Sequence, residues 1–461
     1  MEFWDVIIIV TYLAAVAGVG FWLARDQDPN NYFVTRNARS TWLTLFSVVS
    51  TNVGAATLLG VASAGFDKGI SWGLNISFIV VFGFLFLGLC ASRLKKLAEN
   101  GQLSTLSQFY LLRYSSRRSH LLSSLLILLA YLIFISAQFR GLSQMMAYWT
   151  GSTVSFSIIT SAVLMIALTS LRGIKGDMYT DGFHFVVMFV GVLIVLPYFL
   201  FHGHVTTDQI LHLPSDYFNP FNNKGEVFFF GSIVFGIPVL FASMEFWQLL
   251  FSLKDESVKK TKARNLFFLA ALLNAPMILI PTILGLAERL LNPKLLTPDL
   301  ALIDLIRISL PEGARGLAAV SLLGAIMSTV SGMTLVASST LSLDIFQYRL
   351  NKQLTFREKK LITGAVALIG ALCASRLGGI VDQLIIGCQI IGILAPSLVG
   401  GLWLDNRFER AAFYSLIIGI VAFLAALVTP LGPNLAFVPA VSLSTLTYIC
   451  AVVAISRKLG R

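Results

Sequence analysis

The chain has 461 residues and a formal net charge of +11, with 56% hydrophobic but only 12% charged residues. A soluble domain carries about 25% charged residues, so this composition excludes an ordinary soluble protein and indicates one that crosses a membrane many times. The positive charge does not indicate nucleic-acid binding, because the apolar segments leave no basic folded domain that could bind it.

Apolar runs follow one another along the whole chain, and each is long enough to cross roughly 30 Å of hydrocarbon as a helix. The first run begins at Met1 without the basic start or the cleavage site of a signal peptide, so we expect it to remain as a membrane helix. The sequence predicts an all-α membrane protein with about 13 transmembrane helices. They lie at about 4–24, 41–65, 72–92, 121–149, 152–171, 181–201, 228–252, 265–287, 315–343, 359–376, 380–403, 410–429 and 436–455.

Positively charged residues gather in alternate connections between these runs. Of the 34 Lys and Arg residues, 26 lie in connections that would share one side of the membrane, from Arg25 at the first connection to Arg461 at the end. Cytoplasmic connections carry an excess of Lys and Arg. We therefore predict a multi-pass protein of the plasma (cytoplasmic or inner) membrane, with its N-terminus outside and its C-terminus in the cytoplasm.

Two predicted helices carry residues that interrupt a helix. The first is polar at Ser50–Gly54, and the second contains Gly236-Ile237-Pro238, where proline lacks an N–H. They lie five spans apart and so in opposite orientations, as in an inverted repeat with discontinuous helices. We predict an extra N-terminal helix and cytoplasmic connection at 1–40, a first repeat at 41–201, an external loop at 202–227, a second repeat at 228–403 and two C-terminal helices at 404–461. An external segment, 298–306, is predicted to form a short amphipathic helix over the mouth of the protein.

The run Leu322–Phe346 places two adjacent hydroxyls, Ser328 and Thr329, in the middle of an apolar helix. Hydroxyl oxygens are hard, uncharged ligands, of the kind that a small alkali cation accepts when it loses part of its water. Alternatively, each hydroxyl bonds to a carbonyl one turn earlier, which is common in membrane helices. This helix alone leaves both interpretations open.

Several motifs follow one another between about Tyr32 and Phe346. The segment Asn31–Asn37 (NYFVTRN) resembles a yFlaGR motif, Leu171-Arg172-Gly173 with Tyr179-Thr180-Asp181 resembles GG…WTD, and Gly324–Thr329 with Asp344–Phe346 resembles AAlmSs…tmDiy. Ser47–Gly69 and Ser136-Ala137-Gln138 resemble a broken first core helix and part of a third core helix. In this order, the motifs resemble those of the sodium/solute symporters, the family that includes proline, galactose and sialic acid transporters. The resemblance implies a five-plus-five inverted-repeat (LeuT-like) core.

The resemblance also implies a sodium site between the first and eighth core helices. Its ligands would be the backbone carbonyls of Ser50, Val53 and Ala325 and the hydroxyls of Ser328 and Thr329. Neutral oxygens, partly from unwound backbone, can bind a monovalent cation without burying a fixed anion. Asp181 resembles the family's acid beside the ion exit path. Alternatively, its carboxylate caps a helix start near Lys175.

The sequence departs from the family pattern at positions that bear on the solute. Leu250-Phe251 stands where members often carry Gln-Arg, and His184 stands where a glutamine is usual. In the first broken helix, Ala55-Ala56-Thr57 replaces the longer polar side chains of the sugar transporters. Because sugar recognition needs many directional hydrogen bonds, the sequence favours an amino acid or a carboxylate over a sugar.

Two ionisable residues stand out within the predicted spans, Arg140 in FISAQFRGLSQMM and Glu245 in LFASMEFWQLL. Intramembrane charges are costly and usually face a cavity or a partner. Either the two residues neutralise one another, or Arg140 holds a substrate carboxylate through its planar guanidinium, which would resemble sialic acid transporters. The pocket would then be shaped by Thr57, Gln138, Gln144, Phe241, Glu245 and Trp247.

The predicted function is secondary-active symport, in which sodium binding drives the import of a small polar organic solute by alternating access. Two alternatives stay open: coupling to protons, with Glu245 or His184 as the carrier, and a transporter-like nutrient sensor that works with a separate signalling partner. An enzyme is not expected, because the chain shows no nucleophile–base pair, metal cluster or phosphate loop. The expected partners are the solute, sodium as the coupling ion and the lipid bilayer, with no organic cofactor and no nucleic acid.

Overall fold

The computed structural model describes residues 2–24, 32–36, 39–101, 103–222, 225–254, 260–429 and 435–458. Within these ranges the regular elements are helices, and strand-like pairing is limited to an isolated bridge between Arg39 and Leu253. The all-α prediction is therefore confirmed. The ends of the motif Asn31–Asn37 and the cations Arg25 and Arg461 lie outside the described residues.

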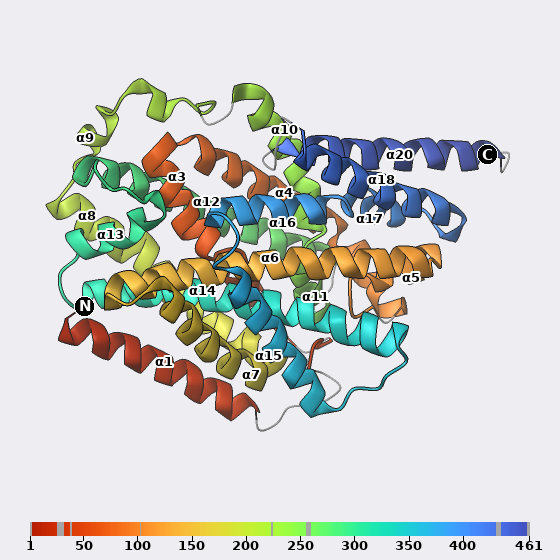
Figure 1. Cartoon of the computed structure of the whole chain (residues 1–461), viewed down its shortest axis with the longest axis horizontal. Helices are drawn as coiled ribbons and strands as arrows, with labels where there is room; N and C mark the ends of the chain where they lie inside the picture. The colour runs from red at the N-terminus through yellow and green to blue at the C-terminus, as the bar shows by residue number, and fades with distance from the viewer. Residues whose placement is uncertain are drawn as a thin grey trace.

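Long helices run across the molecule in roughly one direction, with α1 at one side and α18 and α20 at the opposite side (Figure 1). The longer helices are α1 (Phe3–Ala24), α2 (Thr41–Asn52), α4 (Ser71–Gly101), α6 (Arg117–Thr150), α7 (Val154–Val190), α10 (Gly225–Phe241), α12 (Lys260–Leu291), α14 (Ala314–Ser339), α15 (Phe356–Cys373), α16 (Ile380–Gly392), α18 (Glu409–Leu427) and α20 (Phe437–Lys458). The shorter ones are α3 (Val61–Lys68), α5 (Gln108–Tyr114), α8 (Leu196–Gly203), α9 (Thr207–Leu211), α11 (Met244–Ser252), α13 (Ala301–Ser309) and α17 (Ala395–Gly401). Wider π-helical turns form η2 (Ala56–Gly60), η3 (Gly191–Val195) and η7 (Thr340–Arg349).

Among the described residues, eight helices are long and apolar enough to cross a membrane, and three bent helix pairs raise the number to 11 if each pair is one span. The other two predicted spans coincide with the shorter apolar segment Val154–Ser170 and with α15, whose first turn is charged. The chain is thus a multi-pass membrane protein. The count of 13 spans, the orientation of the termini and the division into inverted repeats stay predictions.

The helix α7 contains most of one predicted span and the first half of the next, and a single residue, Gly173, interrupts its helical backbone. Gly173 has a φ of 55°, a conformation that favours glycine. A Cβ atom at this position would lie 2.7 Å from the Tyr32 ring, so the close approach also requires glycine. The sequence predicted a longer connection between these two spans, but one glycine is enough to separate them.

Three helix pairs are bent at a break. The predicted interruption at Ser50–Gly54 is present, because α2 ends at Asn52, Val53 is extended, and the following helix turns by 56°. The second break differs from the prediction: α10 continues past Pro238 to Phe241, and the chain bends by 43° before α11 begins at Met244. Proline removes one helical hydrogen bond, but the Ala242 N–H still donates to the Pro238 carbonyl (3.0 Å), so the helix persists for another turn.

A third break, between α16 and α17, was not predicted, and the two helices meet at 42°. The signal was present in the sequence, because Pro396 occupies the first turn of α17, where proline is tolerated.

The hydroxyl-bearing helix α14 lies at the centre of the bundle, between α6 and α7 and against α1 and α2 (Figure 1). In its most apolar window 94% of the residues are buried, compared with 22% for α1 and for α20. Lipid-facing helices expose apolar side chains, whereas α14 is enclosed by protein. Its hydroxyls therefore face protein atoms and not lipid.

The segment predicted as an amphipathic helix forms a 3-10 turn at Pro298–Leu300 followed by α13. It packs more deeply than a surface helix, because Asp304 is buried and accepts hydrogen bonds from Tyr148 on α6 and from Asn292 (2.8 Å). Burial raises the pKa of Asp304, but these hydrogen bonds and the nearby charge of Arg307 bring the pKa below its usual value. An ionised Asp304 thus holds α13 onto the ends of α6 and α12.

Candidate sodium and solute sites

The five residues predicted as cation ligands converge at the break of α2. The Thr329 hydroxyl lies 3.0 Å from the Ala325 carbonyl oxygen, 3.2 Å from that of Val53 and 3.5 Å from that of Ser50. It also lies 3.2 Å from the Thr51 carbonyl oxygen. A hydroxyl donates a single hydrogen, so four carbonyl oxygens around it are more acceptors than it can satisfy.

The carbonyls of Ser50, Thr51 and Val53 are available because α2 ends there. Beyond Asn52 the backbone is extended, so carbonyls in the last turn of α2 lose the amide that would follow in a continuous helix. Ser328 brings its hydroxyl to 3.1 Å from that of Ser50, and both side chains are fully buried. The result is a buried cluster of neutral oxygens that joins α2 to α14, which is a suitable donor set for an alkali cation.

Two carboxylates on α7 flank this oxygen cluster. The Ser328 hydroxyl donates to Asp181 Oδ1 at 2.6 Å, and Ser331 donates to Asp177. Asp177 and Asp181 are one turn apart on the same face of α7 and are both buried. Asp181 lies within α7 and contacts α14, so it does not cap a helix start. Sequence analysis missed Asp177 and Ser331. The signal was present, because Asp177 lies four residues before Asp181 and Ser331 lies three residues after Ser328, and each pair shares one helix face.

Gln138 closes the other side of the break. Its Oε1 accepts a hydrogen bond of 2.6 Å from the Ala55 N–H, at the start of the second half of the broken helix. Gly54 lies between this amide and the oxygen cluster, because a Cβ there would be 2.4 Å from Gln138 Oε1 and 2.8 Å from Thr329 Oγ1. A side chain at Gly54 would therefore force Gln138 and Thr329 to move away from the break. Gln138, predicted to shape a solute pocket, instead stabilises the interrupted backbone in this structure.

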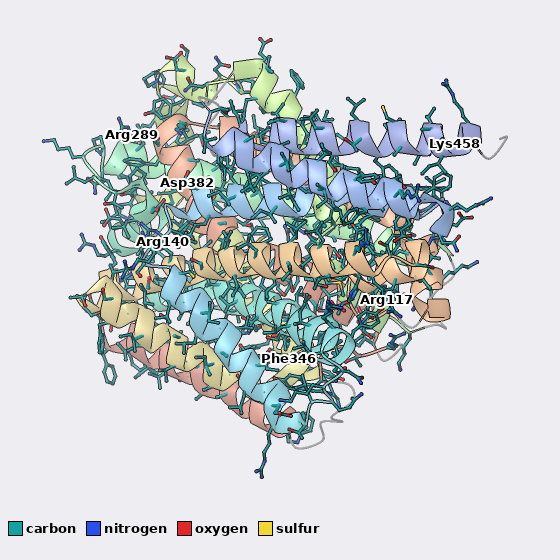
Figure 2. The ribbon with its side chains drawn as sticks, turned by 45° about the vertical axis from the view of Figure 1, so that its right-hand side comes forward. Arg117, Arg140, Arg289, Phe346, Asp382 and Lys458 are labelled. Carbon is teal, nitrogen blue, oxygen red and sulfur yellow. The ribbon has the colours of Figure 1, made fainter. Side chains whose placement is uncertain are left out.

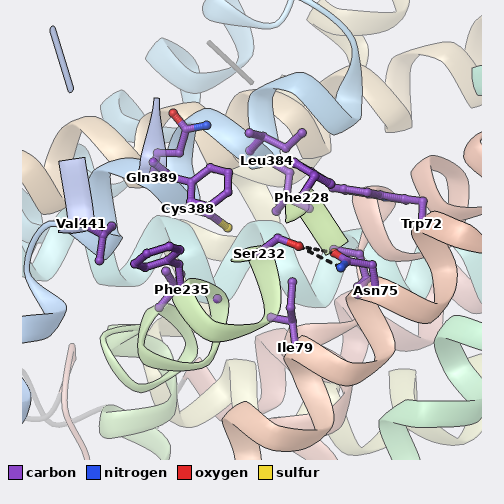
Figure 3. Close-up of a pocket in the computed structure, with 15 residues that line it drawn as sticks. Trp72, Asn75, Ile79, Phe228, Ser232, Phe235, Leu384, Cys388, Gln389 and Val441 are labelled. Atoms are coloured by element: carbon purple, nitrogen blue, oxygen red, sulfur yellow. Dashed lines mark hydrogen bonds between the residues drawn. The ribbon is translucent and has the colours of Figure 1, made fainter. Parts of the chain in front are cut away.

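A separate cavity of about 110 Å³ lies between α4, α10, α16 and α20 (Figure 3). Its polar groups are few: Asn75 donates to the Ser232 hydroxyl at 2.8 Å and to the Phe229 carbonyl at 2.9 Å, and Gln389 contributes an amide. The rest of its lining is apolar or aromatic: Trp72, Ile76, Ile79, Phe228, Phe235, Gly236, Val239, Leu384, Ile385, Cys388, Phe437 and Val441. An apolar pocket with a few placed polar groups is typical of a small-molecule site.

A model of the sodium:solute symporter family matches residues 32–419. The chain belongs to this family. Among its relatives, the sodium/pantothenate symporter of Haemophilus influenzae (strain ATCC 51907 / DSM 11121 / KW20 / Rd) is 22% identical and aligns over 93% of this chain and 90% of its own length. The sodium/glucose cotransporter 4 of Danio rerio is also 22% identical, over 91% of this chain and 71% of its own length.

Solved structures agree on the fold. A sodium-coupled sialic acid symporter in a substrate-bound outward-open state superposes with a TM-score of 0.82, at 19% identity and with 98% of both chains covered. Mhp1, a nucleobase-cation-symport-1 family transporter, gives a TM-score of 0.61 at 14% identity, covering 93% of this chain and 96% of its own. The family resemblance and the LeuT-like fold class predicted for the symporter are therefore confirmed.

In this symporter Arg140 and Glu245 do not pair. The Arg140 guanidinium reaches the carbonyl oxygens of Leu377 (3.2 Å) and Ala374 (3.5 Å), between α15 and α16. Glu245 accepts a hydrogen bond from Tyr131, which precedes Arg140 by nine residues on α6, or about 13 Å along the axis. The two side chains therefore have separate hydrogen-bond partners, all of them neutral groups. Glu245 instead faces a small cavity that Asp177 and Asp181 also line.

The other residues predicted for the solute pocket do not line a common cavity in the described part of the chain. Trp247 donates from its indole to the Phe241 carbonyl (2.6 Å), and the two fully buried rings pack 5.5 Å apart. Thr57 donates to the Asn52 carbonyl (3.0 Å) across the break of α2. None of these residues, nor Gln144, lines the apolar cavity. Sequence analysis missed Asn75 and Gln389, although isolated amides within apolar runs are a usable signal of an intramembrane polar site.

Proposed function

We propose that the protein is a sodium-coupled symporter that imports a small organic solute across the plasma membrane by alternating access. The observation that carries this proposal is the excess of carbonyl oxygens around the Thr329 hydroxyl, where α2 ends against α14. A sodium ion could contact several of these oxygens at once, because its positive charge attracts the partial negative charge of each oxygen. Its proposed ligands are the carbonyl oxygens of Ser50, Val53 and Ala325 and the hydroxyls of Ser328 and Thr329.

Occupancy of this site would connect two elements that move relative to one another in alternating access. Because α2 contributes unwound carbonyls and α14 contributes hydroxyls, a bound ion holds the broken helix against α14 and favours one state. We propose that the ion leaves along Asp181, whose carboxylate already contacts the Ser328 hydroxyl. Asp177, Glu245 and their small cavity would continue that path.

For the solute, we propose an amino acid or a carboxylate rather than a sugar. The cavity between α4, α10, α16 and α20 offers few hydrogen-bonding side chains, whereas a sugar needs many. The relatives that carry sodium in their names include pantothenate symporters, glucose cotransporters and myo-inositol cotransporters, so the relatives alone do not decide the solute. Arg140 does not line this cavity. We retain it as a proposed carboxylate ligand at a separate position, because among the described residues its guanidinium contacts the neutral carbonyls of Ala374 and Leu377.

Uptake into proteoliposomes tests the coupling ion. At a fixed and equal pH on both sides, an inward sodium gradient should drive accumulation of the solute, and an inward potassium gradient should not. Accumulation driven by a proton gradient without sodium would reject the proposal and favour proton coupling through Glu245 or His184. Sodium-dependent binding without any uptake would favour a sensor.

Thermal unfolding of the purified protein identifies the solute class. Amino acids, monocarboxylates and sugars are added one by one, with and without sodium. A true solute binds only the folded protein and raises its unfolding temperature, and coupling requires a larger shift when sodium is present. A sugar that stabilises more than every carboxylate would contradict the proposed solute class.

A further inference from the structure

A basic cavity of about 360 Å³ lies between the start of α6 and the end of η7, away from the sodium and solute sites. It is lined by Arg117, Arg118, His120, Leu121, Tyr348 and Arg349. Arg117 lies at the same end of the bundle as Lys458, and Arg289 lies at the opposite end (Figure 2). The positive-inside rule assigns the end with Arg117 and Lys458 to the cytoplasm.

Among the described residues, the three arginines of this cavity have no acidic partner. Within the described ranges none of them forms an ion pair, and the first turn of α6 carries no acid. The nearby Asp344 is fully buried and already engaged by His120 (3.2 Å) and Thr105 (2.8 Å). A helix start also carries a partial positive charge, which disfavours cations there. An anion is therefore the missing partner of this cavity.

The shape of the surrounding surface indicates which anion. Leu121 lines the cavity, and Leu125 and Leu129 follow it at one-turn intervals on α6, each with 51% of its surface exposed. Tyr348 at the rim is 44% exposed, as expected for an aromatic residue at a membrane interface. The basic cavity thus continues into an apolar ridge along α6, where an acyl chain can lie.

We propose that this cavity binds the phosphate of an anionic phospholipid headgroup at the cytoplasmic face of the membrane, with the acyl chain along Leu121, Leu125 and Leu129. Guanidinium groups bind phosphate oxygens through paired hydrogen bonds, and basic pockets beside membrane helices bind anionic headgroups. The lipid would join α6 to η7, which continues from α14. This inference does not depend on which solute or ion the protein carries.

Thermal unfolding of the full chain in a neutral detergent tests this site, with phosphatidylglycerol, phosphatidylcholine or inorganic phosphate added at constant ionic strength. Phosphatidylglycerol should raise the unfolding temperature by a few degrees, and the other two additives should have little effect. The variant R117Q/R118Q/R349Q should lose this shift. The control R357Q/R410Q/R457Q removes three exposed cations outside the cavity and should keep it.

Three results would overturn the proposal. The first is a shift that persists in R117Q/R118Q/R349Q, and the second is an equal shift in the control and the cavity variant. The third is equal stabilisation by inorganic phosphate, which would assign the cavity to a free anion. If the triple variant does not fold, native mass spectrometry of the wild-type protein decides: retention of phosphatidylglycerol over phosphatidylcholine supports the site, and equal retention rejects it.

Discussion

The proposed sodium site and the apolar cavity differ in how the chain builds them. The sodium site is made of backbone carbonyls and small hydroxyls, densely packed where two helices meet. The cavity is made of large side chains from four helices, with polar contacts confined to Asn75, Ser232 and Gln389. An ion is recognised by many short oxygen contacts, and an organic solute by shape and a few directional bonds. Substitutions should therefore separate the two functions.

The largest effect is expected at Gly54. Alanine there would place a Cβ atom 2.4 Å from Gln138 Oε1 and 2.8 Å from Thr329 Oγ1, so both the cap of the broken helix and the oxygen cluster must move. We expect Gly54→Ala to lose all measurable uptake and about 1–3 kcal/mol of stability from overpacking. Uptake and thermal unfolding are measured together.

Gly18→Ala is the control for this substitution, because no atom lies within 4 Å of a Cβ there. Alanine favours a helix over glycine by about 1 kcal/mol, so this variant should be as stable as the wild type or slightly more so. Normal uptake in Gly54→Ala would show that the break tolerates a side chain. It would contradict the claim that uptake requires the close packing of Gly54 against Gln138 and Thr329.

The next largest effect is expected at Thr329. Thr329→Val keeps the shape of the side chain but removes its hydroxyl, which lies among four carbonyl oxygens. Loss of one ligand to a charged partner costs about 1.5–3 kcal/mol, so we expect the sodium affinity to fall by about tenfold or more. The sodium concentration that gives half-maximal uptake measures this change.

Thr334→Val is the matched control on the same helix. Thr334 is also fully buried, but its hydroxyl has no hydrogen-bond partner among the described residues. Removal of its hydroxyl should leave the sodium dependence unchanged. If both variants shift the sodium dependence equally, the effect belongs to α14 packing and not to a cation ligand.

Substitution of Arg140 should reduce solute uptake and leave sodium binding unchanged. Arg140→Lys replaces a planar guanidinium by a point charge that cannot hold a carboxylate through two parallel bonds. We expect uptake of a carboxylate to be abolished, while sodium still raises the unfolding temperature as in the wild type. Arg376→Lys, an exposed position between the two carbonyls that Arg140 contacts, should transport normally. Normal uptake by Arg140→Lys would reject its assignment as a carboxylate ligand.

The same contrast explains what could be predicted from the sequence. The ion cluster depends on two short segments, a polar break near Gly54 and neighbouring hydroxyls on α14, and each segment carries its own signal. The positions of the breaks near Pro238 and Pro396 depend on how the flanking turns satisfy their hydrogen bonds. The sequence therefore predicted the break near Pro238 about one turn too early and did not predict the break near Pro396. A proline marks the region of a break, and the surrounding contacts decide its position.

The proposed solute cavity could not be predicted because its lining comes from four helices that are far apart in the sequence. Phe241 and Trp247 look like pocket residues in a linear sequence, but they pack against each other through a local hydrogen bond. Gln138 likewise looks like a solute ligand, but in the structure it accepts a hydrogen bond from the Ala55 N–H at the start of the helix that follows the break. A polar or aromatic residue within a membrane helix has several possible partners, and only the packing of the helices selects one of them.

The smallest effect is expected at Ser232, where the polar contacts of the cavity are few but partly redundant. Ser232→Ala removes the hydroxyl that receives a hydrogen bond from Asn75, but Asn75 keeps its bond to the Phe229 carbonyl. A single neutral hydrogen bond contributes about 0.5–1.5 kcal/mol, so the solute concentration for half-maximal uptake should rise by less than about tenfold. The maximal rate and the sodium dependence should not change. Ser123→Ala removes a hydroxyl that donates to the His120 carbonyl within α6, away from the cavity, and should leave all three values unchanged. A solute affinity unaltered by Ser232→Ala, together with unaltered affinity when Val441→Phe fills the cavity, would show that the solute binds elsewhere.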